Sequence, residues 1–113
     1  MSTPPIPFDE RLRAATLPIV AVCEPNQYDG PATEYCTYTY TEMPEGRRDD
    51  SAEGVRLLVS LHWFLPTRQR PSKRRRIAAA IEEIEGTPPT VENASDRDGQ
   101  HYVFEFEHLE EGF

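Results

Sequence analysis

The chain has 113 residues, which suits one domain whose core buries roughly two-thirds of the unfolded chain's surface. Because 37% of the residues are apolar, that core must be economical. The net charge is −8, and proteins that wrap nucleic acid are usually basic overall, so general nucleic-acid binding is disfavoured. No stretch approaches the ~20 consecutive apolar residues of a membrane-spanning helix, and the opening segment lacks the apolar region of a signal peptide.

Residues 1–7, MSTPPIP, contain three prolines and cannot form a helix, so we predict a flexible arm. A single domain is then expected over residues 8–113. Its first element is a short helix at about 7–16, in which Phe8 and Leu12 are spaced for one helical face.

Three strands are predicted next. The apolar run at 19–24 indicates a short one, and a polar, turn-rich loop follows at 26–34. Threonines and tyrosines at 35–42 favour a second strand. After a loop at 43–54, the most apolar run in the chain, at 55–65, alternates between an apolar and a mixed face, which predicts a central strand.

A longer helix is predicted at about 72–85, with Ser72 as its N-cap and Gly86 just beyond its last turn. The segments 90–94 and 101–109 then form a hairpin. This order predicts an α+β fold: a single two-layer domain in which one main helix and the short N-terminal helix pack on an antiparallel or mixed β-sheet.

The predicted core joins the apolar face of the central strand to the apolar stripe of the main helix. Its residues are Leu57, Val59, Leu61, Trp63, Ile77, Ile81 and Ile84. The two cysteines, Cys23 and Cys36, are too few for a disulfide framework, so we expect two reduced, buried thiols of a cytosolic product. A structural disulfide is the alternative.

Motifs of catalysis and cofactor binding are missing from the sequence. It has no glycine-rich phosphate loop, and its histidines, His62, His101 and His108, show no metal-ligand spacing. Ser60 beside His62 is a common coincidence on a strand. We expect no enzyme, no catalytic residue, no metal and no cofactor.

The segment RQRPSKRRR, residues 68–76, contains six basic residues in an otherwise acidic chain. Four of them begin the main helix, and Glu82, Glu83 and Glu85 lie near its end and are read as a solvated face. The basic residues therefore lie at the positive end of the helix dipole and the acidic residues at its negative end, and both placements destabilise the helix. Helix stability does not explain this arrangement of charges. A solvated surface, a head-to-tail contact between identical subunits, and phosphate contacts with DNA are the three interpretations.

Four ordered segments then resemble a known family. They are YDGPATEYCTYTYTEMPE, RRDDSAEGVRLLVSLHWFLP, the helix centre RIAAAIEEIEG, and the closing hairpin VENASDRDGQHYVFEFE. Over about residues 20–108 the chain resembles the tail-terminator or tail-completion proteins of long-tailed, siphophage-type bacteriophages and prophages. It departs from them at its N-terminus, where the family usually has a longer helix.

The resemblance implies a structural virion protein that assembles in the host cytoplasm and resides at the head-proximal end of the tail. Such proteins form a homo-oligomeric ring, typically a hexamer, that stops polymerisation of the tail tube protein and meets the head–tail connector. DNA passes through the bore without sequence-specific binding, and no membrane is involved. A neck or head-completion protein of the same particle is the alternative, followed by a small soluble enzyme or binding module.

On this interpretation the subunit or tail-protein interface contains the exposed charged residues, together with the loop at 45–52 and the arm at 2–7. The predicted interface residues are Arg47, Arg48, Asp49, Asp50, Arg68, Arg70, Lys73, Arg74, Arg75, Glu82 and Glu83.

Overall fold

The computed structural model describes residues 8–43 and 54–111. The predicted arm at 1–7 and the charged loop residues Arg47, Arg48, Asp49 and Asp50 therefore lie outside the described residues. The elements are, in chain order, α1 (Phe8–Thr16), β1 (Cys23–Pro25), β2 (Tyr35–Glu42), β3 (Gly54–Leu65), α2 (Arg74–Glu85), β4 (Thr90–Asn93) and β5 (Gln100–Glu111).

The five strands form one mixed sheet in the order β1-β2-β3-β5-β4. The β1–β2 pair is parallel and the other pairs are antiparallel. β3 lies at the centre, where Val59 is paired with Tyr40 on one side and with Phe106 on the other. With its two helices, the chain is a small α+β domain, as the sequence predicts.

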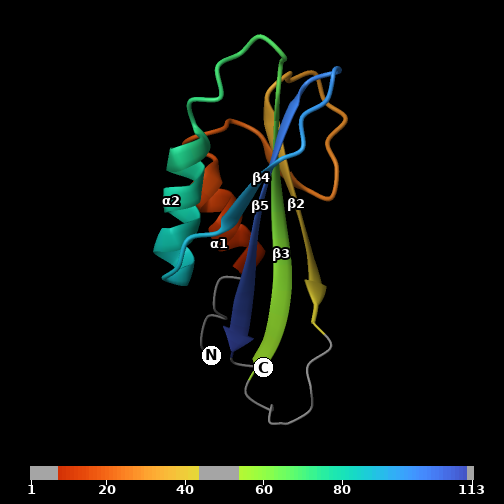
Figure 1. Ribbon diagram of the computed structural model, residues 1–113. Helices are drawn as coiled ribbons and strands as arrows, with labels where there is room; N and C mark the ends of the chain where they lie inside the picture. Colours follow the sequence, from red (N-terminus) through yellow and green to blue (C-terminus); the bar gives the residue numbers. More distant parts are fainter. Residues whose placement is uncertain (1–7, 44–53, 112–113) are drawn as a thin grey trace.

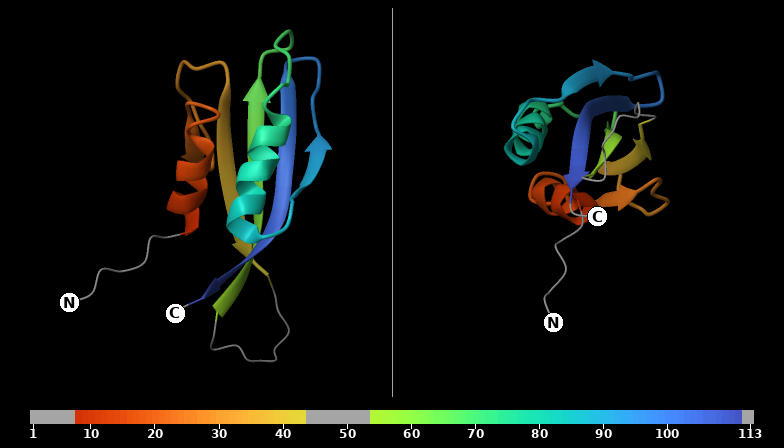
Figure 2. Two further views of the ribbon diagram at one scale, coloured as in Figure 1. Left: turned by 90° about the vertical axis from the view of Figure 1, so that its left-hand side faces the viewer. Right: turned by 90° about the horizontal axis from the view of Figure 1, so that it is seen from below.

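Both helices lie on the same side of the sheet, and the described residues place no helix on the other side (Figures 1 and 2). The covered face supplies the core, because successive side chains of a strand point to opposite faces. β3 contributes Leu57, Val59, Leu61, Trp63 and Leu65, all buried, and β5 contributes Tyr102, Phe104 and Phe106. From the helices come Phe8, Leu12, Ile77 and Ile81, with Ile84 partly buried against them. Neither helix covers the sheet by itself.

Two predicted boundaries are corrected. The first strand begins at Cys23 rather than at Ile19, because the backbone N–H groups of Ile19 and Val20 donate to the carbonyl of Thr16 and hold both residues in a turn after α1. Ser72 is not the N-cap of α2: that position belongs to Lys73, which makes no side-chain capping bond. The backbone N–H of Ser72 instead donates to the carbonyl of Arg70, which places Ser72 in the preceding turn.

The C-terminal end of α2 agrees with the prediction. Gly86 adopts a left-handed conformation with φ of 84°, and its N–H donates to the carbonyl of Glu82. Glycine accepts this backbone conformation without steric cost.

The cysteines are paired residues of β1 and β2, and both are buried free thiols. Burial raises the pKa of Cys23 to about 11 and also raises the pKa of Cys36. Neither thiol is therefore reactive while the core stays closed.

Candidate functional site

The side of the sheet without helices carries a continuous row of aromatic rings. Tyr35, Phe64 and His101 occupy directly opposite positions on β2, β3 and β5. The ring centroids of Tyr35 and Phe64 are 4.9 Å apart, and those of Phe64 and His101 are 4.2 Å apart. Tyr28, from the loop before β2, extends the row with its ring 4.9 Å from that of Tyr35. We call Tyr28, Tyr35, Phe64, His101 and the adjoining His62 the aromatic row.

The two histidines of the row touch each other. The Nδ1 atom of His62 and the Nε2 atom of His101 are 2.8 Å apart, so one imidazole donates to the other. Burial lowers the pKa of His62, with the Glu105 carboxylate partly offsetting it. Burial and the neighbouring His62 lower the pKa of His101, while Asp96 acts in the opposite direction. Burial therefore favours the neutral form of both rings.

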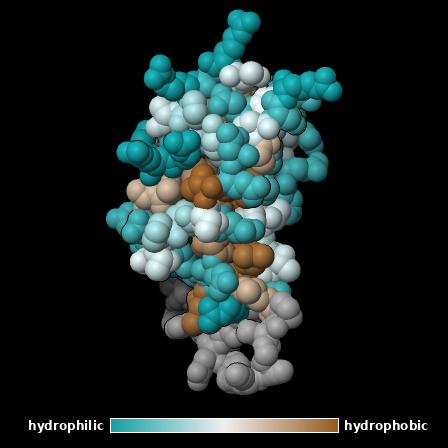
Figure 3. Space-filling model, in the orientation of Figure 1, coloured by the Kyte–Doolittle hydropathy of each residue, from teal (hydrophilic) through white to brown (hydrophobic). Residues whose placement is uncertain are grey.

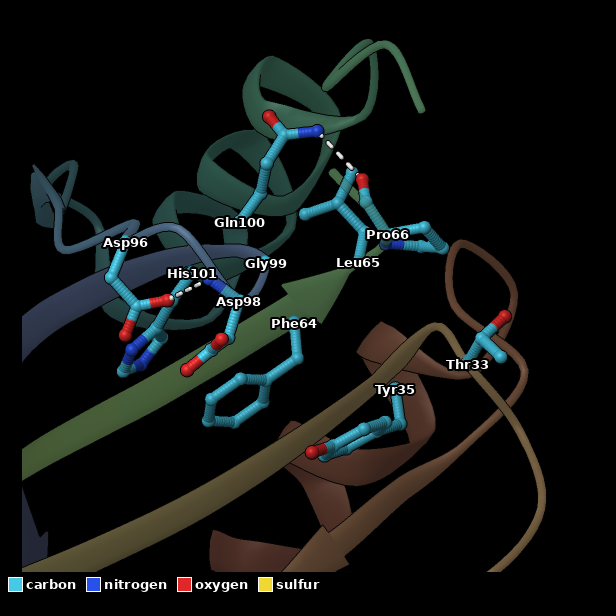
Figure 4. Close-up of a pocket in the computed structure, with 10 residues that line it drawn as sticks. All are labelled: Thr33, Tyr35, Phe64, Leu65, Pro66, Asp96, Asp98, Gly99, Gln100 and His101. Carbon is cyan, nitrogen blue, oxygen red and sulfur yellow. Dashed lines mark hydrogen bonds between the residues drawn. The ribbon is translucent and has the colours of Figure 1, made fainter. Parts of the chain in front are cut away.

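The row ends in a hollow of about 470 Å³ (Figure 4). The rings of Tyr35, Phe64 and His101 line it, and Asp96 and Asp98 come from the turn between β4 and β5. Its remaining lining residues are Thr33, Leu65, Pro66, Gly99 and Gln100. The volume lies within the roughly 300–1,000 Å³ of typical ligand pockets, but this hollow is open to solvent at the surface.

The acidic turn beside the hollow has a fixed backbone. The N–H of Asp98 donates to Oδ1 of Asp96 at 2.8 Å, and the N–H of Asp96 donates to the carbonyl of Gly99 at 3.0 Å. Both aspartates are exposed, so their charges are available to a partner. The turn thus places two carboxylates next to the aromatic rings.

The basic segment follows β3 and is tied to β5 by one side chain. The amide Nε2 of Gln100 donates to the carbonyl of Pro66 at 2.9 Å, and also bonds the carbonyls of Thr67 and Gln69. The loop that carries Arg68 and Arg70 is consequently held at the same end of the sheet as the hollow.

A second anchor fixes the start of α2. The Nζ of Lys73 donates to Oε1 of Glu34 at 2.9 Å, and the indole Nε1–H of Trp63 donates to Oε2 of the same carboxylate at 2.9 Å. Burial by itself would raise the pKa of Glu34, but the hydrogen bonds from Lys73, Trp63 and Gln69 together lower it. Lys73, predicted as an interface residue, is thus ion-paired with Glu34 of the same chain.

The other described interface candidates are exposed: Arg68, Arg70, Arg74, Arg75, Glu82 and Glu83. The guanidinium of Arg74 lies 5.9 Å from the centre of the Tyr102 ring. Glu85, expected on the solvated face, is an exception. Its Oε2 atom lies 2.6 Å from Nδ1 of His108, and both side chains are only 9% exposed.

Sequence reasoning missed the aromatic row, Glu34 and Gln100. The row's members come from four separate segments, and only strand register brings them together. The one available signal was the mixed face of β3, where His62 and Phe64 alternate with the core residues. Among residues 8–43 and 54–111, no cluster of three potential metal ligands and no helix able to span a membrane is found.

Comparison with known proteins supports the fold. No protein-family model matches the chain, and no curated protein does. A solved structure that bears no functional name superposes with a TM-score of 0.62 at 14% sequence identity, covering 94% of this chain and 92% of that chain. At this identity the likeness shows a common fold and nothing about function.

Proposed function

We propose that the chain is a structural virion protein: a tail terminator that assembles into a homo-oligomeric ring at the head-proximal end of a phage tail tube. The ring, a hexamer by analogy with the family that the sequence resembles, stops tube polymerisation and presents a surface to the head–tail connector. DNA passes through its bore without sequence-specific contacts. The protein performs no catalysis and needs no cofactor.

The observation that carries this proposal is the uncovered face of the sheet. A sheet in a two-layer domain normally buries one face and exposes a polar one. Here the exposed side carries the aromatic row, and Leu58 and Leu109 on the same face are 38% and 46% exposed. Aromatic rings and exposed leucines on a face that also carries Glu105 and Glu107 favour a protein interaction site there.

The surface charges also support assembly. Arg75 lies in the first turn of α2, and Glu82 and Glu83 lie in its last turns, all exposed. The helix of 12 residues is ~18 Å long, so charges of opposite sign are well separated on one element. Opposed charges at different places on one surface favour a head-to-tail contact, which closes into a ring when the rotation permits. Figure 3 shows apolar surface in separate brown patches among polar side chains on the side facing the viewer of Figure 1, which is typical of a mixed, polar-rimmed surface.

The test is to purify the full chain and measure its mass by light scattering, then add it to polymerising tail tube protein and measure tube lengths by electron microscopy. We expect a mass that is a multiple of 12.9 kDa and tubes that become shorter as the protein is added. A chain that stays monomeric at every concentration and leaves tube length unchanged contradicts the proposal.

The same experiment distinguishes a tail terminator from a neck or head-completion protein of the same particle. A neck or head-completion protein would bind the connector and leave tube length unchanged. A tail terminator limits tube length even when no connector is present.

A further inference from the structure

The hollow at the end of the aromatic row has the chemistry of a cation receptor. The stacked rings of Tyr35, Phe64 and His101 line it as apolar surface, and Asp96 and Asp98 add two carboxylates. An arginine suits both features, because its apolar stem packs on such a surface and its guanidinium donates paired hydrogen bonds to carboxylates. Glu105 and Glu107 add two carboxylates to the rest of this face, which also carries Leu58, Leu109 and Arg56, the last ion-paired with Glu107 at 3.6 Å.

The chain itself presents exposed arginines at a matching place. Gln100 lines the hollow and also holds the loop that leads to α2, so the hollow and the start of α2 lie at one end of the sheet (Figures 1 and 4). α2 lies on one side of the sheet and the aromatic row on the other. One subunit's arginines can therefore reach the next subunit's hollow at the same level along the strands.

The outward surface of α2 carries two of these arginines, Arg75 and Arg76, both exposed. Ile77 and Ile81 face the core, and at ~100° per residue Arg75 lies further from them around the helix than Arg76 does. Arg74, by contrast, lies over Tyr102, and Lys73 is bonded to Glu34.

We propose that the hollow is the receptor half of the subunit interface, and that Arg75 of a second copy of this chain enters it. The inference rests on the proposed ring and names the surfaces that form it. The outward side of α2 in one subunit covers the bare sheet face of the next, so the layers alternate around the ring. Such a contact joins two different surfaces and repeats by rotation, as ring closure requires.

An alternative contact surface for the basic segment is the acidic end of α2 in the neighbouring subunit, at Glu82 and Glu83. Whether Arg75 contacts the hollow or the acidic end of α2, assembly should weaken when the charge of Arg75 is reversed. The two contacts differ in which second reversal restores assembly.

Thiol cross-linking tests the contact directly. The variants Arg75→Cys and Asp98→Cys are purified separately, mixed, and treated at the concentration at which the ring forms with a short bis-maleimide, whose spacer replaces the reach of the arginine side chain. We expect a cross-linked dimer in the mixture and little in either variant alone. Cys23 and Cys36 do not compete, because both are buried.

The matched control is Thr87→Cys, an exposed residue between α2 and β4 that belongs to neither surface. Mixed with Asp98→Cys, it reports random collision and should cross-link at least about tenfold less. Equal yields in the two mixtures overturn the inference. So does a cross-link of Asp98→Cys with itself alone, which would mean that two hollows face each other.

Charge reversal provides the second measurement. Arg75→Glu and Asp98→Lys should each weaken assembly about tenfold or more, and the double variant should recover most of it. In contrast, Arg75→Glu combined with Glu83→Lys should stay weak. Recovery by Glu83→Lys in place of Asp98→Lys assigns the contact to the helix end and overturns the inference.

The outcomes separate this inference from the proposed function. Rings that cap tubes without the 75–98 cross-link contradict only the hollow's assignment. Cross-linked rings that leave tube length unchanged contradict only the tail-terminator proposal. A monomer that gives no cross-link and no effect on tubes contradicts both.

Discussion

At the scale of single residues, Glu34 joins three parts of the fold through one carboxylate. It accepts hydrogen bonds from the indole N–H of Trp63 in the core and from the ammonium of Lys73 at the start of α2. Replacing Glu34 with Gln removes the negative charge that Lys73 faces and keeps only part of the hydrogen bonding. We expect the free energy of unfolding to fall by about 1–3 kcal/mol, measured by urea denaturation at pH 7.

The dependence of the unfolding free energy on pH in the acidic range should also change in Glu34→Gln. Because the pKa of Glu34 is lowered from 4.5 in the folded state, its contribution is present above that value and is lost as the pH falls below it. The control is Glu24→Gln, which breaks the exposed ion pair with Arg13 and should cost less than about 1 kcal/mol. Equal losses in the two variants would show that Glu34 has no special role.

The histidine pair predicts a second pH effect at higher pH. The pKa of His62 and that of His101 are both lowered from 6.5, so the unfolded chain takes up protons before the folded chain does. Stability is therefore complete above about pH 6.5 and decreases as the pH falls below it. Urea midpoints measured from pH 7.5 to 5.5 should decrease, and His62→Gln should reduce the decrease. A variant with an unchanged pH profile would assign the effect to other groups.

At the scale of secondary-structure elements, the two faces of β3 should contribute differently to the free energy of unfolding, because successive side chains alternate between them. Leu61 is fully buried and Leu58 is 38% exposed on the same strand. Leu61→Ala should lower the free energy of unfolding by about 2–5 kcal/mol, because the cavity among packed side chains cannot collapse completely. Leu58→Ala is the matched control and should cost well under about 1 kcal/mol. Similar losses, measured by urea denaturation, would mean that both faces are packed within the single chain.

The spacing of apolar residues predicted these elements well, because apolar residues recur every two residues on the buried face of a strand and every three to four on that of a helix. It predicted the bounds of β2 within the segment 35–42, and β3 and α2 almost as closely. It did not reveal the parallel pairing of β1 with β2, or that Ile19 and Val20 belong to a turn. Those features depend on backbone hydrogen bonds to Thr16 and on strand order, which hydrophobic periodicity does not encode.

The candidate site was harder to predict for a related reason. Tyr35, Phe64 and His101 are far apart in sequence and meet because β2, β3 and β5 pair in one particular register. Glu85 looked solvated by its position among other acids, yet His108 of β5 lies within 2.6 Å of it. Long-range register and side-chain pairing across layers are tertiary properties, and a single sequence carries little information about them.

At the scale of the whole molecule, the cysteines report on the opening of the complete core. Cys23 and Cys36 are both fully buried and lie on neighbouring strands. We expect alkylation of the two thiols in native buffer to occur at one common slow rate, set by unfolding of the domain. Leu61→Ala should accelerate both by the same factor, measured by mass spectrometry. Labelling of Cys23 well before Cys36 would instead show that β1 opens separately.

The strand order also has a consequence for how the chain is made. The partner of β3 on one side, β2, precedes it, but its other partner, β5, is synthesised after α2 and β4, with Leu65 pairing to Gln100. At ribosomal rates of ~5–20 residues per second, the long apolar edge of β3 waits seconds for its partner. An unpaired edge of that kind invites pairing with other nascent chains. Protein made on crowded polysomes should therefore depend on chaperones more than its small size suggests, and slower translation past Leu65 should increase the insoluble fraction.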